Sequence, residues 1–157
     1  MVADCFTSLG MNCMNDDIAL IDTNLIVYSY DTSDKKKHET CKNLVEAAFK
    51  GEAPLAVSNQ ILAETFFVLT QKLKNPSSSE DAEAIVDGII DSINWKKINY
   101  TDETVKKAII LSRNHSIGLW DSLIAETSLE NGIKKIYTEN VKDFRKIPGL
   151  RAVNPFS

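Results

Sequence analysis

The feature that most constrains the fold is an alternation, along the whole chain, between short apolar runs and longer stretches of helical periodicity. The runs have the length and composition of buried strands. They lie at residues 18–21, 53–58, 94–100, 133–138 and 150–154. Strands that alternate with helices form parallel sheets covered on both faces. The sequence therefore predicts a three-layer α/β/α fold with a central, mainly parallel sheet of four to five strands.

Helices are predicted between these runs, and residues 139–149 are predicted to form a loop. The helices are expected near residues 24–30, 41–49, 59–74, 78–93, 102–115 and 118–132. Ser58 and Thr101 are typical N-cap residues, and Gly132 has the position of a glycine just after a helix C-terminus. The apolar side chains of the first long helices are expected in the core, among them Phe49, Phe66, Phe67 and Leu69.

The length of 157 residues is that of one domain. Residues 1–17 show no sustained periodicity, so we expect a disordered N-terminal extension followed by a single domain over residues 18–157. No apolar run approaches the roughly 20 residues of a membrane span, so no contact with a membrane is expected.

The three cysteines include no C-x-x-C pair, which argues against a disulfide framework or a zinc site and suggests a reducing cytoplasm. Cys41 has the spacing of a buried helix residue. The net charge of −4 argues against a protein that binds nucleic acid through its overall charge. It does not exclude an enzyme whose metal ions supply the positive charge locally.

Three acidic residues stand in apolar surroundings near the ends of predicted strands. Asp22 follows the first strand, Glu64 lies in the helix after the second, and Asp121 lies in the helix before the fourth. Each has a simpler interpretation: a helix N-cap for Asp22, a rim position for Glu64, and an acid in a first helical turn for Asp121.

Taken together, the three acids favour a different explanation. In open α/β sheets, ligands bind outside the carboxyl ends of the strands, and the topology brings these acids to that edge. Neighbouring carboxylates repel one another unless a cation neutralises them. A ligand set made only of oxygen atoms selects Mg²⁺ or Mn²⁺ over zinc.

Four sequence blocks carry a resemblance to a known family. The blocks "IDTNLIVY", "ILAETFFVL", "LWDSLIAETSLENGI" and "YTENVKDFRKIPGL" resemble, in this order, those of the PIN-domain ribonucleases, and among them the VapC-like toxins of prokaryotic toxin–antitoxin pairs. The resemblance spans residues 18–154. It implies a Mg²⁺- or Mn²⁺-dependent endoribonuclease with an RNA substrate, a cognate antitoxin as partner, and a homodimer.

The resemblance also assigns roles to the acids. Asp22, Glu64 and Asp121 match the first three metal-binding, catalytic acids of the family. Thr23 matches the hydroxyl residue that helps to hold the first acid.

The fourth acid of the family pattern is missing. It usually stands two residues after the threonine of the last block, where this chain has Asn140. Asn140 itself, Glu139 beside it and Asp143 beyond it are the candidates for that role. Occupancy of a second metal position is therefore left open.

Arg113, Lys142 and Arg145 flank the predicted acidic edge and are candidates for contacts with the RNA backbone. Three other functions stay open. They are an RNA-processing PIN nuclease without an antitoxin, a catalytically weak PIN fold that only binds RNA or protein, and a receiver-like signalling domain. A receiver needs an aspartate after its third strand, and the run at residues 94–100 ends without one in an apolar setting.

Overall fold

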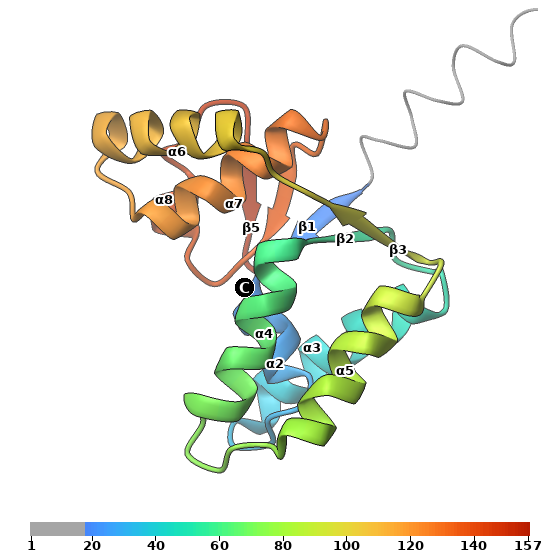
Figure 1. Ribbon diagram of the computed structural model, residues 1–157. Helices are drawn as coiled ribbons and strands as arrows, with labels where there is room; N and C mark the ends of the chain where they lie inside the picture. Colours follow the sequence, from blue (N-terminus) through green and yellow to red (C-terminus); the bar gives the residue numbers. More distant parts are fainter. Residues whose placement is uncertain (1–17) are drawn as a thin grey trace, which may run out of the picture.

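The computed structural model describes residues 18–157, and the predicted N-terminal extension lies outside this part. The described chain alternates strands and helices as the sequence predicts (Figure 1). In order the elements are β1 Ala19–Ile21, α2 Thr23–Tyr28, α3 Lys35–Phe49, β2 Leu55–Ser58, α4 Asn59–Gln71, α5 Ser79–Asp91, β3 Trp95–Ile98, α6 Asp102–His115, α7 Leu119–Glu130, β4 Lys135–Tyr137, α8 Val141–Phe144 and β5 Arg151–Val153.

The strands form one parallel sheet in the order β3-β2-β1-β4-β5. The predicted α/β fold with a parallel sheet is therefore confirmed, and all five predicted strands are present. β1 is the central strand: Ala19 is in register with Leu55 of β2, and Leu20 with Ile136 of β4.

The strand order reverses between β1 and β4. From β1 the chain moves through β2 to β3 on one side, and it then returns to place β4 and β5 on the other side of β1. Because crossovers between parallel strands are right-handed, this reversal sends the later helices to the opposite face of the sheet. Figure 1 shows α2 to α5 gathered on one side and α6 to α8 on the other. A crevice for a ligand is expected at such a switch point, outside the carboxyl ends of β1 and β4.

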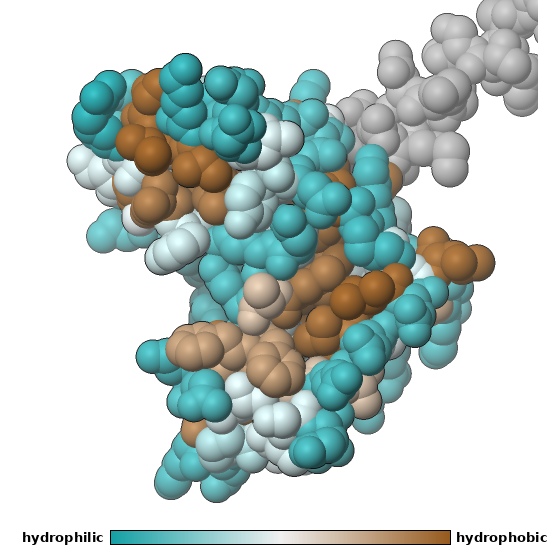
Figure 2. All heavy atoms as spheres, viewed as in Figure 1, coloured by the Kyte–Doolittle hydropathy of each residue, from teal (hydrophilic) through white to brown (hydrophobic). Residues whose placement is uncertain are grey.

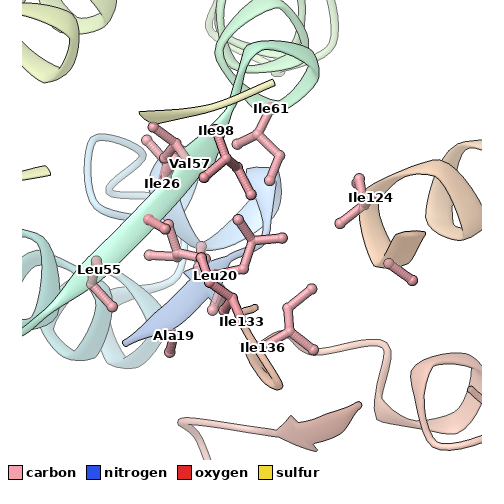
Figure 3. Close-up of a cluster of buried hydrophobic side chains, with 14 of the residues drawn as sticks. Ala19, Leu20, Ile26, Leu55, Val57, Ile61, Ile98, Ile124, Ile133 and Ile136 are labelled. Atoms are coloured by element: carbon pink, nitrogen blue, oxygen red, sulfur yellow. The ribbon is translucent and has the colours of Figure 1, made fainter. Parts of the chain in front are cut away.

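The core lies against both faces of β1, whose three residues are fully buried. Figure 3 shows Leu20 beside Ile136 of β4, with Ile61 of α4 and Ile124 of α7 among the surrounding side chains. Cys41 is buried here as predicted, and it is a free thiol. No helix within residues 18–157 is long and apolar enough to cross a membrane.

The prediction that Phe66 and Phe67 lie in the core is wrong. Phe66 is 38% exposed and Phe67 is 51% exposed. The buried residues of α4 are Gln60, Ile61, Thr65 and Leu69, and the last three stand one turn from each other in a stripe. The two phenylalanines follow Thr65 directly along the chain, so the helical rotation carries them out of that stripe.

Three predicted helix-end signals agree with the structure, but α3 begins at Lys35 rather than near residue 41, because its first turns are polar and the apolar spacing starts only at Cys41. The predicted loop at residues 139–149 also contains a further element. The Ser58 hydroxyl accepts a hydrogen bond from Ile61 N, and Thr101 forms a capping box with Thr104. Gly132 has a φ of 74°, which suits a glycine after a helix end. The single turn of α8 was missed because it is too short to show periodicity. It buries Phe144 completely.

Candidate active site

Asp22 occupies the point where β1 passes into α2. Its backbone has the extended conformation of an N-cap residue, yet its side chain makes no capping hydrogen bond. Instead, Asp22 Oδ2 accepts a hydrogen bond of 2.7 Å from the hydroxyl of Thr138, which follows β4. The side chain is thus directed across the switch point rather than onto its own helix, which argues against the helix-cap interpretation.

Glu64 projects from α4 and is held by two donors. Thr23 Oγ1 donates to Glu64 Oε2 at 3.0 Å, and Gln60 Nε2 donates to Glu64 Oε1 at 2.8 Å. The expected supporting residue, Thr23, therefore holds the second acid of the site rather than Asp22. Gln60 Nε2 also donates to the carbonyl oxygen of Trp120 at 3.2 Å, which ties α4 to the start of α7.

Asp121 lies in the first turn of α7, where a carboxylate is favoured by the helix dipole. Its Oδ2 accepts a hydrogen bond of 3.0 Å from Asn140 Nδ2, and the same amide lies 3.3 Å from Asp143 Oδ2. Asn140 thus separates two carboxylates as a neutral donor. Asp143 is also paired with Lys146 at 2.7 Å, so its charge is already partly neutralised.

Glu139 is directed away from the other acids. It accepts a hydrogen bond of 2.9 Å from the Tyr28 hydroxyl and forms an ion pair with Lys37. The Lys37 ammonium group also lies 4.8 Å from the centroid of the Tyr28 ring. Glu139 therefore fixes the backbone between Thr138 and Asn140, whose side chains hold the two aspartates of the site.

We expect Lys37→Ala to reduce activity at the site although Lys37 makes no contact there. Residues that orient metal ligands typically contribute about 10- to 100-fold, and the loss of this ion pair would loosen the segment that carries Asn140. The exposed pair Lys107–Glu130, with a distance of 2.7 Å, offers the control variant Lys107→Ala. For the metal-dependent cleavage of RNA that the sequence resemblance implies, both the rate and the Mn²⁺ affinity should fall for Lys37→Ala only. Equal behaviour of the two variants would contradict the positioning role.

The three predicted acids come together in one cleft of about 930 Å³. Asp22, Glu64, Asp121 and Asn140 line it, whereas Glu139 and Asp143 do not. Burial, reinforced by the charges of Asp121 and Glu64, raises the pKa of Asp22 to about 6, against the opposing effect of the Thr138 hydrogen bond. Burial also raises the pKa of Asp121, and the charges of Asp143 and Glu64 act in the same direction.

The side chains fit a divalent cation in chemistry, although they are not arranged as a ready cage. Within residues 18–157 no group of three or more His, Cys, Asp or Glu side chains has the arrangement of a metal site. Each acid of the cleft is instead turned to a neutral donor. None of the three takes part in a salt bridge with a described residue. Three hard carboxylates without a cationic partner suit Mg²⁺ or Mn²⁺.

The cationic residues of the cleft differ from those that the sequence suggested. Arg113, Lys142 and Arg145 are exposed and do not line the cleft, whereas Lys72, the residue that follows α4, does. Sequence reasoning also missed Gln60, although it lies one helical turn before Glu64 and so shares its face of the helix. Three aromatic residues of the cleft wall were missed as well: Phe67, Tyr100 and Trp120.

The fold and the cleft define an open α/β domain with an acidic site at its topological switch point. Residues 19–150 match the sequence model of the PIN domain. The chain therefore belongs to the PIN-domain family, as the four sequence blocks suggested. Comparison with curated proteins gave no match.

Solved structures with this fold include toxins of toxin–antitoxin pairs. One is a toxin–antitoxin complex from Klebsiella pneumoniae, with 21% identity, a TM-score of 0.58, and coverage of 87% of this chain and 97% of the other. Another is VapC20 of Mycobacterium tuberculosis, a sarcin–ricin loop cleaving toxin, with 20% identity and a TM-score of 0.61. The match covers 78% of this chain and 89% of VapC20. VapBC2 of Rickettsia felis, bound to a fragment of promoter DNA, has 22% identity and a TM-score of 0.61. The match covers 87% of this chain and 98% of the matched chain. At these identities the likeness shows the shared fold.

Proposed function

We propose that the protein is a divalent-metal-dependent endoribonuclease whose metal ligands and catalytic residues are Asp22, Glu64 and Asp121. The observation that carries this proposal is that three acids, one just after β1 and the others in α4 and α7, line one cleft without a cationic partner among the described residues. Burying such charges is costly, so the arrangement calls for a bound cation. Membership of the PIN family and the fold shared with an RNA-cleaving toxin support RNA as the substrate.

A divalent ion held by these acids would supply positive charge that polarises a phosphodiester and makes a water molecule more acidic. The chain itself orients the ligands. Thr138 donates a hydrogen bond to Asp22 Oδ2, and Asn140 donates one to Asp121 Oδ2. Thr23 and Gln60 hold Glu64 from two sides. Such fixed orientation lowers the reorganisation needed when substrate phosphate binds.

The direct test is cleavage of an unstructured RNA by the full chain with Mg²⁺, with Mn²⁺ and with an excess of chelator. We expect cleavage with either metal, none with chelator, and recovery when metal is restored. Calorimetry should show Mn²⁺ binding that is lost in Asp121→Asn. Cleavage that persists in chelator would contradict the metal-dependent mechanism.

Asn140→Asp should strengthen metal binding and weaken the metal-free fold. The substitution adds an anionic ligand, but it removes the amide that donates to Asp121 and lies 3.3 Å from Asp143. We expect a lower metal-free melting temperature, a smaller Mn²⁺ dissociation constant and half-maximal cleavage at a lower Mn²⁺ concentration. Asp143→Asn is the matched control, since Asp143 does not line the cleft. Weaker metal binding in Asp143→Asn would instead assign Asp143 as the fourth ligand.

We also propose that the protein is the toxin of a toxin–antitoxin pair and that it forms a homodimer. The toxin assignment is supported by structures with the same fold that were solved as toxin–antitoxin complexes, one of them on promoter DNA. The homodimer is what the resemblance of the four sequence blocks implies. Expression of the active protein alone should arrest growth, and expression of Asp121→Asn should not. Light scattering should give twice the monomer mass. Normal growth with active protein and no partner would contradict the toxin assignment.

A further inference from the structure

The wall of the cleft beside the acids is aromatic. Phe67, Tyr100 and Trp120 line it together with Asp22 and Glu64. Phe67 is 51% exposed and Trp120 is 64% exposed. Figure 2 shows hydrophobic side chains exposed over α4 and α5, beside the hollow that separates these helices from α6, α7 and α8. Large aromatic side chains that are exposed around a cleft indicate a ligand-binding surface.

The backbone of Trp120 is tied to the acidic residues. Trp120 directly precedes Asp121, and its carbonyl oxygen accepts a hydrogen bond of 3.2 Å from Gln60 Nε2. The same amide donates to Glu64 at 2.8 Å. The Trp120 side chain is therefore attached to the backbone next to Asp121, and Gln60 links that backbone to Glu64, so two of the proposed metal ligands are neighbours of Trp120.

Phe67 provides a second aromatic surface in the cleft. It follows Glu64 by one turn of α4, so both residues project from neighbouring positions of the same helix. The Lys72 ammonium group lies 5.5 Å from the centroid of the Phe67 ring. Lys72 lines the cleft and forms no salt bridge with a described residue, so it is free to meet an anionic group beside the ring.

We propose that Trp120 and Phe67 form a nucleobase-stacking subsite for the bases next to the cleaved phosphodiester. This inference rests on the proposed nuclease function. The cleft of about 930 Å³ has the size of a small-molecule site and exceeds what a cation and one phosphate group require. Aromatic rings bind bases of any sequence through their faces, and Lys72 matches the charge of the adjoining phosphate. A base inside a duplex has both faces covered, so the subsite requires an unpaired base.

The two tryptophans of the chain allow a direct optical test. Trp95 is 2% exposed in the core, so a fluorescence change on RNA binding reports on Trp120. The full chain with Glu64→Gln, which should not cleave, is titrated with Mn²⁺ present against three probes. These are a labelled unstructured RNA decamer, the same decamer paired with its complement, and the same decamer with abasic sites at its centre.

We expect the unpaired decamer to quench the fluorescence, and the paired and abasic decamers to leave it nearly unchanged. In the same background, Trp120→Ala should weaken binding by about 5- to 150-fold, the range of one stacked base, and Trp120→Phe should retain most of the affinity. Ile93→Ala is the matched control, because Ile93 is 95% exposed and does not line the cleft. It should bind like the background protein.

Equal affinity for the abasic and intact decamers, or an unaffected Trp120→Ala, would overturn the subsite even if the wild-type chain cleaves RNA. Quenching that grows with protein concentration in the absence of RNA would also overturn it, because a second copy would then cover the indole. Base-dependent quenching without cleavage by the wild-type chain would support the subsite and contradict the nuclease. The two proposals can therefore fail separately.

Discussion

Asp121→Asn is expected to lower RNA cleavage by more than about 100-fold while the protein remains folded. Loss of a residue that only orients a metal ligand already costs about 10- to 100-fold, and Asp121 would be a ligand itself. The amide oxygen of the variant can still accept the hydrogen bond that Asn140 donates at 3.0 Å. The substitution also removes repulsion by Asp143 and Glu64, which adds to burial in raising the pKa of Asp121. The rate should be measured with RNA in excess and with saturating Mn²⁺.

Asp91→Asn provides the comparison for this variant, because Asp91 is an exposed acid at the end of α5, outside the cleft. It should cleave RNA at the wild-type rate. A melting curve of each variant separates loss of function from loss of fold. If Asp121→Asn melts as a folded protein and cleaves within about threefold of the wild type, Asp121 does not act at the site as proposed.

The metal-free protein is expected to lose stability as the pH rises through the range in which Asp22 ionises. The pKa of Asp22 is raised from 3.8 to about 6, chiefly by burial and then by Asp121 and Glu64. Between these values the folded state binds more protons than the unfolded state, so the free energy of unfolding falls with pH. A shift of this size corresponds to about 3 kcal/mol of destabilisation of the folded state. This destabilisation is absent below pH 3.8, where Asp22 is protonated, and reaches its full size above pH 6.

Asp22→Asn removes this titration and therefore isolates its contribution. Near pH 4 the variant and the wild type should have similar stability, and near pH 7.5 the variant should be more stable by up to about 3 kcal/mol. Urea unfolding in chelator across this range gives the difference at each pH. Mn²⁺ should then stabilise the wild type more than the variant. A variant that is less stable at every pH would favour the helix-cap role for Asp22.

The sequence predicted the acids of the site because the physics behind their positions is simple. Parallel strands end at one edge of the sheet, so an acid after β1 and acids in helices next to strand ends must lie near one another. Asp22, Glu64 and Asp121 line one cleft, as that rule requires. Their role in binding metal stays a prediction for the experiments above.

The directions in which individual side chains point could not be predicted from the sequence. From the sequence, the neighbours Glu139 and Asn140 are equally good candidates for a metal ligand. In the structure, Glu139 forms an ion pair with Lys37 and Asn140 donates a hydrogen bond to Asp121. This choice depends on Lys37, whose helix is remote in sequence. Phe67 looked like a core residue because hydrophobicity alone does not say which face of a helix lacks a partner.

The central position of β1 also has a consequence for how the protein is made. Asp22 receives its hydrogen bond from Thr138, which comes 116 residues later in the chain. During synthesis the first strand and its acid therefore emerge long before β4 can pair with them, and contacts between such distant segments are the slowest to form. The cleft is complete only when the chain as far as Asn140 has left the ribosome. Under the proposed function, a nascent chain stalled before β4 should therefore lack nuclease activity, so the translating ribosome and its message would not be exposed to cleavage by the unfinished chain.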